Sequence, residues 1–268
     1  MVSKDQRRRQ LAREKLARQQ QRRSTARRKA KHRNVVVAGA VAVALAAGAA
    51  AYASVGLAGG DDRAAPSTDP CGKPAQGSPS QKTWKKEPAM SIDTKASYSA
   101  TLHTTCGTIG LKLDAAKAPH TVNSFAFLAH QGFFDHSRCH RLVDQGIYVL
   151  QCGDPTATGN GTPGYTIPDE NLKDPRLKGG VYPAGTLAMA NTYDGRNDKT
   201  RNSGGSQFFL VYQDSKLPPN YTPFGTVTGG MDVLRKIAGA GATAPDPQTG
   251  NTAPHATVVI DRATVDKS

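Results

Sequence analysis

The sequence lacks three features that would assign it quickly to a common class of protein. It contains no internal repeat, which excludes solenoids and propellers. Its glycine-rich stretch at 153–164 has no Lys-Ser or Lys-Thr ending, so it predicts turns and not a phosphate-binding loop. The histidines and the cysteine between positions 130 and 140 fit no closed set of zinc ligands. We therefore expect no metal site and no cofactor.

Acidic residues are scarce relative to basic ones, but the imbalance is local. The 268 residues include 35 Lys and Arg against 21 Asp and Glu, a formal charge of +14. Residues 1–33 hold fourteen of these basic residues and two of the acidic ones. The rest of the chain is nearly neutral, so nothing in its charge predicts that the folded part binds nucleic acid.

An uncharged run follows this basic tail. Residues 35–58 are 24 residues without a charge, rich in Ala, Val and Gly. A helix of that length spans roughly 36 Å, more than the roughly 30 Å of bilayer hydrocarbon. We therefore predict one transmembrane helix over residues 34–58, which gives a single-pass protein of the cell membrane. Two alternatives stay open: a signal peptide cleaved at Ala51-Tyr52-Ala53, and a buried core helix.

The charge pattern also predicts the orientation of this segment. Positive flanks stay in the cytoplasm, so residues 1–33 form a cytoplasmic tail and the rest of the chain lies outside. We expect the tail to contact anionic lipid through its Lys and Arg side chains. A specific cytoplasmic partner or a nucleic acid is the alternative for the tail.

Four cysteines follow the apolar run, at Cys71, Cys106, Cys139 and Cys152. An even number on the predicted outer face permits two disulfides, which four cysteines can form in three pairings. Cys139 and Cys152 flank a predicted hairpin. We therefore favour Cys139–Cys152 together with Cys71–Cys106, with free buried thiols as the alternative.

The chain after the apolar run divides by composition. Residues 59–95 are rich in Pro, Ser and Gly, which predicts a linker, and Trp84 near its end is expected to dock onto the domain. The folded domain is predicted over residues 96–268. Apolar periodicity and turn residues predict two helices, from Pro119 and over 231–238, and strands over 98–103, 108–113, 185–190, 207–212 and 257–265. Many short strands with two separated helices indicate a mainly β protein, a closed antiparallel barrel with a helix over each end.

Four motifs carry the most specific signal. They are Cys139-His140-Arg141-Leu142-Val143, Val149-Leu150-Gln151-Cys152-Gly153-Asp154, Leu187-Ala188-Met189-Ala190-Asn191, and Gly204-Gly205-Ser206-Gln207-Phe208-Phe209-Leu210. Together they supply one arginine, several neutral amides and two phenylalanines, with no nucleophile paired to a base. Such a set suits a site that holds an apolar ring and a peptide backbone without breaking a covalent bond.

In combination these motifs resemble the cyclophilin family of peptidyl-prolyl cis/trans isomerases, over roughly residues 96–266. The resemblance implies a closed eight-stranded barrel with two capping helices. It also implies acceleration of X-Pro bond rotation in proline-containing polypeptides. With the predicted membrane helix, the chain is similar to a membrane-anchored bacterial, actinobacterial-like form acting on exported proteins.

The resemblance also implies roles for individual residues. Arg141 would donate a hydrogen bond to the prolyl nitrogen of the twisted amide, Gln151 would orient Arg141, and Phe209 would form the floor of the proline pocket. The residues expected to contact substrate are Tyr148, Val149, Ala190, Asn191, Gln207, Leu217 and Tyr221.

Several departures from the family pattern concern this site, and two of them lie in the proline pocket. Ten residues separate His140 from Gln151 where the family commonly has eight, and Tyr221 stands where a histidine is usual. These differences leave open an alternative function, a proline-peptide binding module or scaffold with little catalytic activity.

Overall fold

The structure is a computed structural model that describes residues 69–193, 197–246 and 251–267. The predicted cytoplasmic tail, transmembrane helix and first part of the linker lie outside these ranges. Within them, no helix combines the length and the apolar character needed to cross a membrane.

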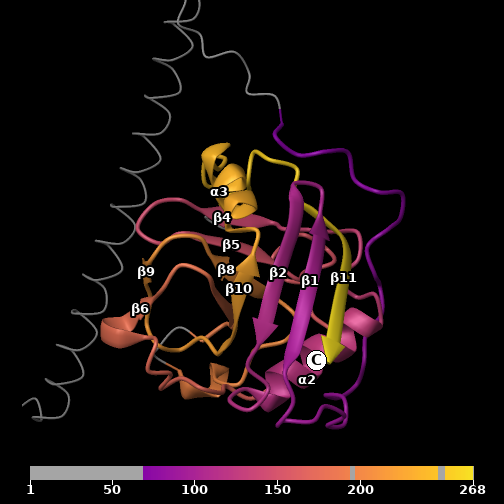
Figure 1. Ribbon diagram of the computed structural model, residues 1–268, viewed down its shortest axis with the longest axis vertical. Coiled ribbons are helices and arrows are strands. Elements are labelled where there is room, and N and C mark those ends of the chain that lie inside the picture. The colour runs from indigo at the N-terminus through magenta and orange to yellow at the C-terminus, as the bar shows by residue number, and fades with distance from the viewer. Residues whose placement is uncertain (1–68, 194–196, 247–250, 268) are drawn as a thin grey trace, which may run out of the picture. The chain divides into compact units, whose positions relative to one another are not determined.

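Antiparallel strands form most of the regular structure (Figure 1). Nine of them make one sheet in the order β3-β11-β1-β2-β10-β7-β8-β5-β4, and β6 pairs with β9 in a separate ribbon. The strands are β1 (Tyr98–Thr104), β2 (Gly107–Leu113), β3 (Ser137–Arg138), β4 (Arg141–Val143), β5 (Val149–Cys152), β6 (Val181–Tyr182), β7 (Thr186–Met189), β8 (Phe208–Val211), β9 (Ser215–Lys216), β10 (Pro223–Gly229) and β11 (Val259–Lys267).

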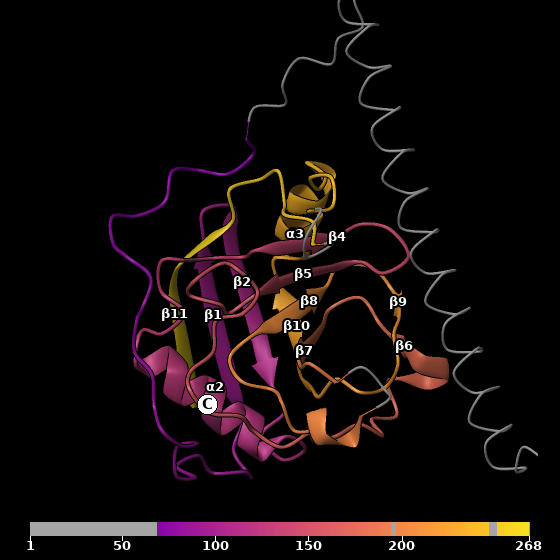
Figure 2. The same cartoon turned by 180° about the vertical axis from the view of Figure 1, so that it is seen from behind.

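Two α-helices lie at opposite ends of the large sheet (Figures 1 and 2). The first, α2 (Pro119–His130), starts at a proline, whose fixed φ suits the first helical turn. Its apolar face buries Phe125, which meets the rings of Phe134, Phe208 and Phe224 at centroid distances of 5.0 to 5.5 Å. The second, α3 (Met231–Gly239), buries its apolar face as well, and two 3-10 turns lie at Lys178–Gly180 and Asp198–Thr200.

The predicted closed eight-stranded barrel is wrong, because the sheet has nine strands and stays open between β3 and β4. Its two end strands are joined by only Cys139 and His140, which span at most about 10 Å, so the sheet curves until its ends are adjacent. No ladder pairs β3 with β4 among the described residues. Backbone outside the strands bonds to the chain at this gap instead. The Cys139 amide donates to the Val258 carbonyl and the Leu142 amide donates to the Thr252 carbonyl, each at 2.9 Å.

The strands β5, β7 and β8 are buried on both faces. Side chains alternate along a strand, so one face of these three packs into the main core and the other faces a second apolar cluster. Phe208 belongs to the main core and is fully buried, while its neighbour Phe209 belongs to the second cluster. This second cluster, formed by Val149, Leu177, Tyr182, Ala188, Phe209 and Val211, lies beneath the candidate site.

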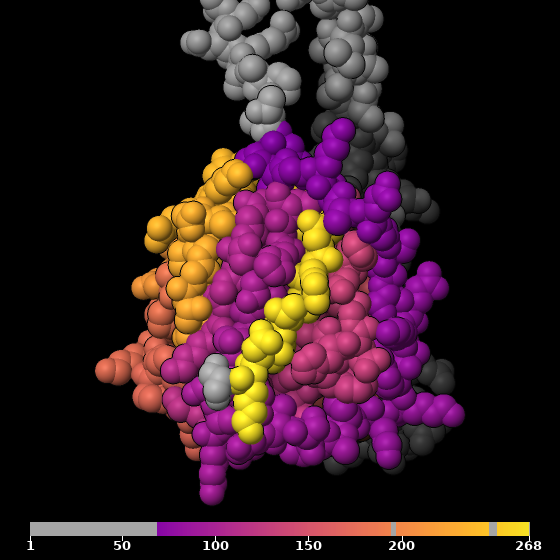
Figure 3. Space-filling view, turned by 45° about the vertical axis from the view of Figure 1, so that its right-hand side comes forward, coloured from indigo at the N-terminus to yellow at the C-terminus, as the bar shows by residue number. Residues whose placement is uncertain are grey.

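Residues 69–95, assigned above to a linker, pack along the domain. The Trp84 ring meets Phe127 at 5.1 Å and Phe133 at 5.9 Å, and the Trp84 amide donates to the Pro163 carbonyl at 2.8 Å. Figure 3 shows this segment as the indigo and purple spheres along the right-hand side of the domain. The docking of Trp84 is confirmed, and the folded part begins well before residue 96.

Two disulfides join Cys71 to Cys106 and Cys139 to Cys152, the predicted pairing. The first ties the segment 69–95 to the turn between β1 and β2. The second lies beside the candidate site, between the start of β4 and the end of β5.

Candidate functional site

A row of residues crosses four neighbouring strands on the face of the sheet that covers the second cluster. The strand register places Arg141 opposite Gln151, Gln151 opposite Phe209, and Phe209 opposite Ala188. Directly opposed residues in antiparallel strands have Cβ atoms about 5 Å apart. The register alone therefore gathers the arginine, the amide and the aromatic ring at one place.

A cavity of about 150 Å³ lies over this row. Its lining consists of Arg141, Ile147, Val149, Gln151, Ala190, Asn191, Phe209, Leu217 and Tyr221. Pockets for drug-sized molecules are roughly 300–1,000 Å³, so this one has room for a single side chain or ring. Apolar side chains and polar groups share the lining, and Arg141 supplies the formal charge.

The Arg141 guanidinium is half-buried at this cavity. Its Nη1 donates to Gln151 Oε1 at 3.2 Å. Burial lowers the pKa of Arg141, and the nearby Tyr221 raises it by a smaller amount. An arginine stays protonated in proteins even so. The site therefore presents a fixed cation with free donor hydrogens beside an apolar slot.

Aromatic rings make the floor and one wall of the slot. Phe209, only 4% exposed, meets the Tyr221 ring edge to face at 5.4 Å. Beneath them Tyr182 is fully buried, and its hydroxyl donates to the Tyr221 carbonyl at 2.8 Å. Burial raises the pKa of Tyr182 to about 12, so this hydroxyl stays a neutral donor. The buried tyrosine thereby fixes the backbone that carries Tyr221.

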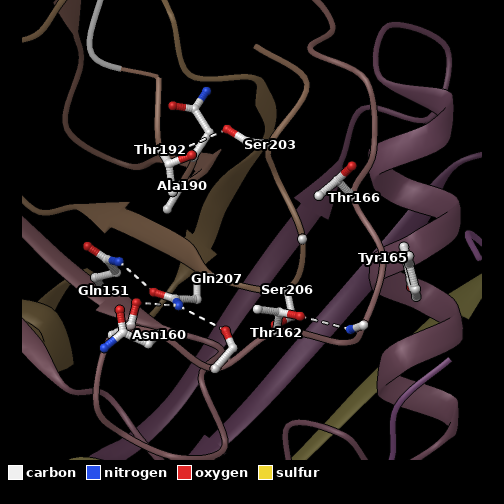
Figure 4. A pocket seen from close by; sticks show the side chains of 15 residues that line it. Gln151, Asn160, Thr162, Tyr165, Thr166, Ala190, Thr192, Ser203, Ser206 and Gln207 are labelled. Carbon is white, nitrogen blue, oxygen red and sulfur yellow. Dashed lines mark hydrogen bonds between the residues drawn. The ribbon is translucent and has the colours of Figure 1, made fainter. Parts of the chain in front are cut away.

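A second cavity of about 420 Å³ adjoins the first and shares Gln151, Ala190 and Asn191 with it. Its lining contains no Asp, Glu, Lys or Arg. Figure 4 shows Gln207 between Gln151 and the loop that carries Asn160. Gln151 Nε2 donates to Gln207 Oε1 at 2.9 Å, which connects the residue shared by both cavities to one that lines the large cavity.

The amide relay ends on a loop at residues 155–161. Gln207 Nε2 donates to the carbonyls of Gly159 at 2.9 Å and Gly161 at 3.0 Å. Asp154, fully buried, holds the same loop by accepting the amides of Gly159 and Gly161 at 2.7 and 3.1 Å. Burial raises the pKa of Asp154, but these bonds and those from Thr156 outweigh it and hold the pKa below its usual value. A charged carboxylate thus organises the loop.

The structure brings nine of the ten predicted site residues to the two cavities. Arg141, Val149, Phe209, Leu217 and Tyr221 line the small one, Gln207 lines the large one, and Gln151, Ala190 and Asn191 line both. The Asn191 side chain also donates to the Asn220 carbonyl at 2.8 Å, which ties the two segments at the rim.

Tyr148 is the exception, and its predicted place in the pocket is wrong. It packs against the main core, where its ring meets Tyr212 at 5.9 Å, and its amide donates to Ser215 Oγ at 2.8 Å. Ile147 lines the cavity instead. Tyr148 directly precedes β5 in extended chain, where successive side chains point to opposite sides, so Tyr148 and Val149 do not both face the cavity. Ile147, two residues before Val149, was the candidate that this alternation favours.

Most of the lining of the large cavity was not predicted. Residues 153–164 are predicted above as turns, and these turns form one wall. Gly153 shows why glycine is needed: its φ is +88°, and a Cβ there would collide with the Ser206 carbonyl oxygen. The density of glycine next to a site motif was the available signal that backbone approaches closely here.

Comparison with known proteins finds matches over the domain that carries this site. The family model for "Cyclophilin type peptidyl-prolyl cis-trans isomerase/CLD" matches residues 99–265. The "Probable peptidyl-prolyl cis-trans isomerase B" of Mycobacterium leprae is 50% identical over 155 residues, 54% of this chain and 50% of that protein. The chain therefore spans about half the length of this relative. The "Peptidyl-prolyl cis-trans isomerase B" of Bacillus subtilis is 36% identical over 131 residues, 48% of this chain and 82% of that protein.

The solved structures give the same result for the fold. A crystal structure of a cyclophilin type peptidyl-prolyl cis-trans isomerase from Cryptosporidium parvum matches with a TM-score of 0.50 and 25% identity. The match covers 64% of this chain and 99% of that one.

Proposed function

Because the chain belongs to the cyclophilin family of peptidyl-prolyl cis/trans isomerases, we propose that it accelerates rotation about X-Pro bonds in polypeptide substrates. The observation that carries the proposal is the pairing of one guanidinium with an apolar slot of single-ring size. No carboxylate, histidine, cysteine or lysine lines that slot. The lining thus supplies binding and one directed cation, which suits a reaction without proton transfer or a covalent intermediate.

The barrier to X-Pro rotation is roughly 18–20 kcal/mol, most of it amide resonance. At the top of that barrier the amide is twisted, and its nitrogen carries a free lone pair. In our proposal the prolyl ring sits on Phe209, and Arg141 donates a hydrogen bond to that nitrogen. The planar amide offers no such acceptor, so the bond favours the twisted state and lowers the barrier.

Gln151 and the large cavity would hold the Arg141 guanidinium and the substrate in place. Gln151 accepts from Arg141 on one side and donates to Gln207 on the other, so the guanidinium is oriented before substrate binds. Preorganised donors avoid the cost of reorganisation during the reaction. In this proposal the large uncharged cavity, which adjoins the slot, would take a neutral side chain next to the proline.

The test is a measurement of cis-to-trans exchange in an Ala-Pro-Phe peptide with the full-length chain purified in a mild detergent. The Arg141→Ala variant is compared with Arg138→Ala, which removes an exposed arginine three residues upstream on β3. We expect acceleration by the parent and by Arg138→Ala, and a loss of about a hundredfold or more in kcat/KM for Arg141→Ala.

Two outcomes would overturn the proposal. If the folded parent binds the peptide without accelerating exchange, the chain is a proline-peptide binding module. If Arg141→Ala loses peptide binding in the same proportion as rate, Arg141 binds the ground state and the transition-state role is wrong.

We also propose that residues 34–58 anchor the chain in the cell membrane with the domain outside and the basic tail in the cytoplasm. The uncharged run, its basic flank and the four cysteines on one side of it support this arrangement. Protease added to intact cells should remove the domain and leave a short tailed fragment in the membrane. Protection of the domain in intact cells, with digestion after lysis, would contradict this orientation.

A further inference from the structure

The Cys139–Cys152 disulfide is placed next to both polar residues of the site. Cys139 lies two residues before Arg141, and Cys152 directly follows Gln151. Both cysteines are buried, at 3% and 1% exposure, in the main core under the sheet. The disulfide therefore joins the two strands that carry Arg141 and Gln151 at one end of the hairpin, and residues 144–148 connect them at the other end.

The strand that carries Arg141 is held by one neighbouring strand and by a few contacts on its outer side. The Leu142 amide donates to the Thr252 carbonyl at 2.9 Å, the Thr252 hydroxyl donates to the Leu142 carbonyl, and the Tyr212 hydroxyl donates to the Val143 carbonyl at 2.8 Å. β4 has three residues, lies at the end of the sheet, and pairs only with β5 among the strands described. The connection from β4 to β5 takes up residues 144–148, and its first three residues are exposed. A three-residue edge strand that leads into a five-residue connection has few ladder bonds to fix its register. The disulfide adds a covalent restraint at the end of the hairpin opposite the connection.

We propose that the Cys139–Cys152 bridge is a positioning element for catalysis, which holds the Arg141 guanidinium at the distance and angle that the twisted amide requires. The inference rests on the proposed function. Neither sulfur contacts substrate; the bridge acts through Arg141 and Gln151.

The second disulfide is a built-in control. Cys71–Cys106 is tied to the segment 69–95 and the β1–β2 turn, and neither of its cysteines lines either cavity. It closes a sequence separation of 35, against 13 for Cys139–Cys152. Under the chain-entropy model, the longer loop stabilises more. Removal of Cys71–Cys106 should therefore lower Tm more, whereas removal of Cys139–Cys152 should lower activity more.

The experiment uses the full-length chain and two double variants, Cys139→Ala/Cys152→Ala and Cys71→Ala/Cys106→Ala. For each we measure Tm, and kcat and KM for the Ala-Pro-Phe peptide. Loss of Cys139–Cys152 should lower kcat about tenfold with KM within about twofold, since small misplacements of a catalytic group cost rate and not affinity. Loss of Cys71–Cys106 should lower Tm at least as much and leave kcat unchanged.

A cycle with Arg141→Ala separates positioning from general weakening. If the bridge acts through Arg141, its removal from the Arg141→Ala protein should change kcat less than about twofold. An equal loss in both backgrounds would overturn the inference, as would an equal kcat loss from removing Cys71–Cys106.

The remaining outcomes are also decisive. A parent without isomerase activity refutes the proposed function and this inference with it. An active parent whose kcat is unchanged by removing Cys139–Cys152 refutes this inference alone. The variant Cys139→Val/Cys152→Ala restores buried volume if the alanine pair does not fold. Failure of both to fold would show that the bridge serves the fold itself and would overturn the positioning role.

Discussion

Gln151 lies directly opposite Arg141 in the β4–β5 pair, and its side-chain oxygen accepts a hydrogen bond from the guanidinium at 3.2 Å. Its amide nitrogen simultaneously donates to Gln207. Gln151 is therefore the link between the cation of the small cavity and the amide relay of the large one. Its removal should free Arg141 without changing the charge of the site.

For Gln151→Leu we expect kcat/KM to fall about tenfold to a hundredfold, equivalent to about 1.4–2.7 kcal/mol of transition-state stabilisation. The change keeps the size of the side chain and removes both hydrogen bonds. The exposed Gln213→Leu provides the matched control. Peptide exchange kinetics give the answer, and unchanged kcat/KM in Gln151→Leu would show that Arg141 needs no orienting partner.

Phe208 and Phe209 allow the two faces of β8 to be tested separately. Phe209→Leu shortens the floor of the slot and should raise KM several-fold with a small change in Tm. Phe208→Leu alters the main core and should cost about 1–1.5 kcal/mol of stability with KM unchanged. Thermal unfolding and Michaelis kinetics on both variants check this. If KM rises for Phe208→Leu and not for Phe209→Leu, substrate binds on the face of β8 that carries Phe208, and the proposed slot is wrong.

His140 should make stability depend on pH. Both of its ring nitrogens are buried, and burial lowers the pKa of the imidazole, an effect that the Asp154 carboxylate opposes. Below about pH 6.5 the unfolded chain therefore binds a proton at this residue that the folded protein does not. The free energy of unfolding accordingly falls as pH drops below about 6.5, until the folded pKa is reached.

Denaturant unfolding at several pH values measures this dependence. His140→Gln should reduce the slope below about pH 6.5, whereas His103→Gln, which replaces an exposed histidine on β1, should preserve it. Equal slopes for His140→Gln and the parent would show that another group causes the acid sensitivity.

Trp84 should contribute to the stability of the domain, although it lies in a Pro- and Ser-rich segment. Its half-buried ring packs on Phe127 and Phe133, so Trp84→Ala should cost about 2–3 kcal/mol and lower Tm by about 5–10 °C. The neighbouring exposed Lys85→Ala is the control, and calorimetry is the measurement. A Tm equal to that of the parent would mean that the segment 69–95 is not held in solution.

Local pattern predicted the individual elements well where one principle dominated. The alternation in 108–113 and the proline at 119 placed β2 and α2 within a residue or two of their observed bounds. The same alternation was not applied to the residues between His140 and Gln151, where it would have assigned Ile147 and not Tyr148 to the cavity. The segment 69–95 was misjudged because proline and serine predict a lack of regular structure, and a chain without regular structure can still pack.

The sequence by itself determined which chemical groups were present: one guanidinium, neutral amides, two adjacent phenylalanines and cysteines placed to bridge a hairpin. These are local properties, set by residue type and spacing. The tertiary structure decided which strands are neighbours, and hence that Arg141, Gln151, Phe209 and Ala188 form one row. It also decided that the sheet stays open between β3 and β4. Both depend on pairing between segments distant in the chain, where the free energy comes from contacts that no local pattern contains.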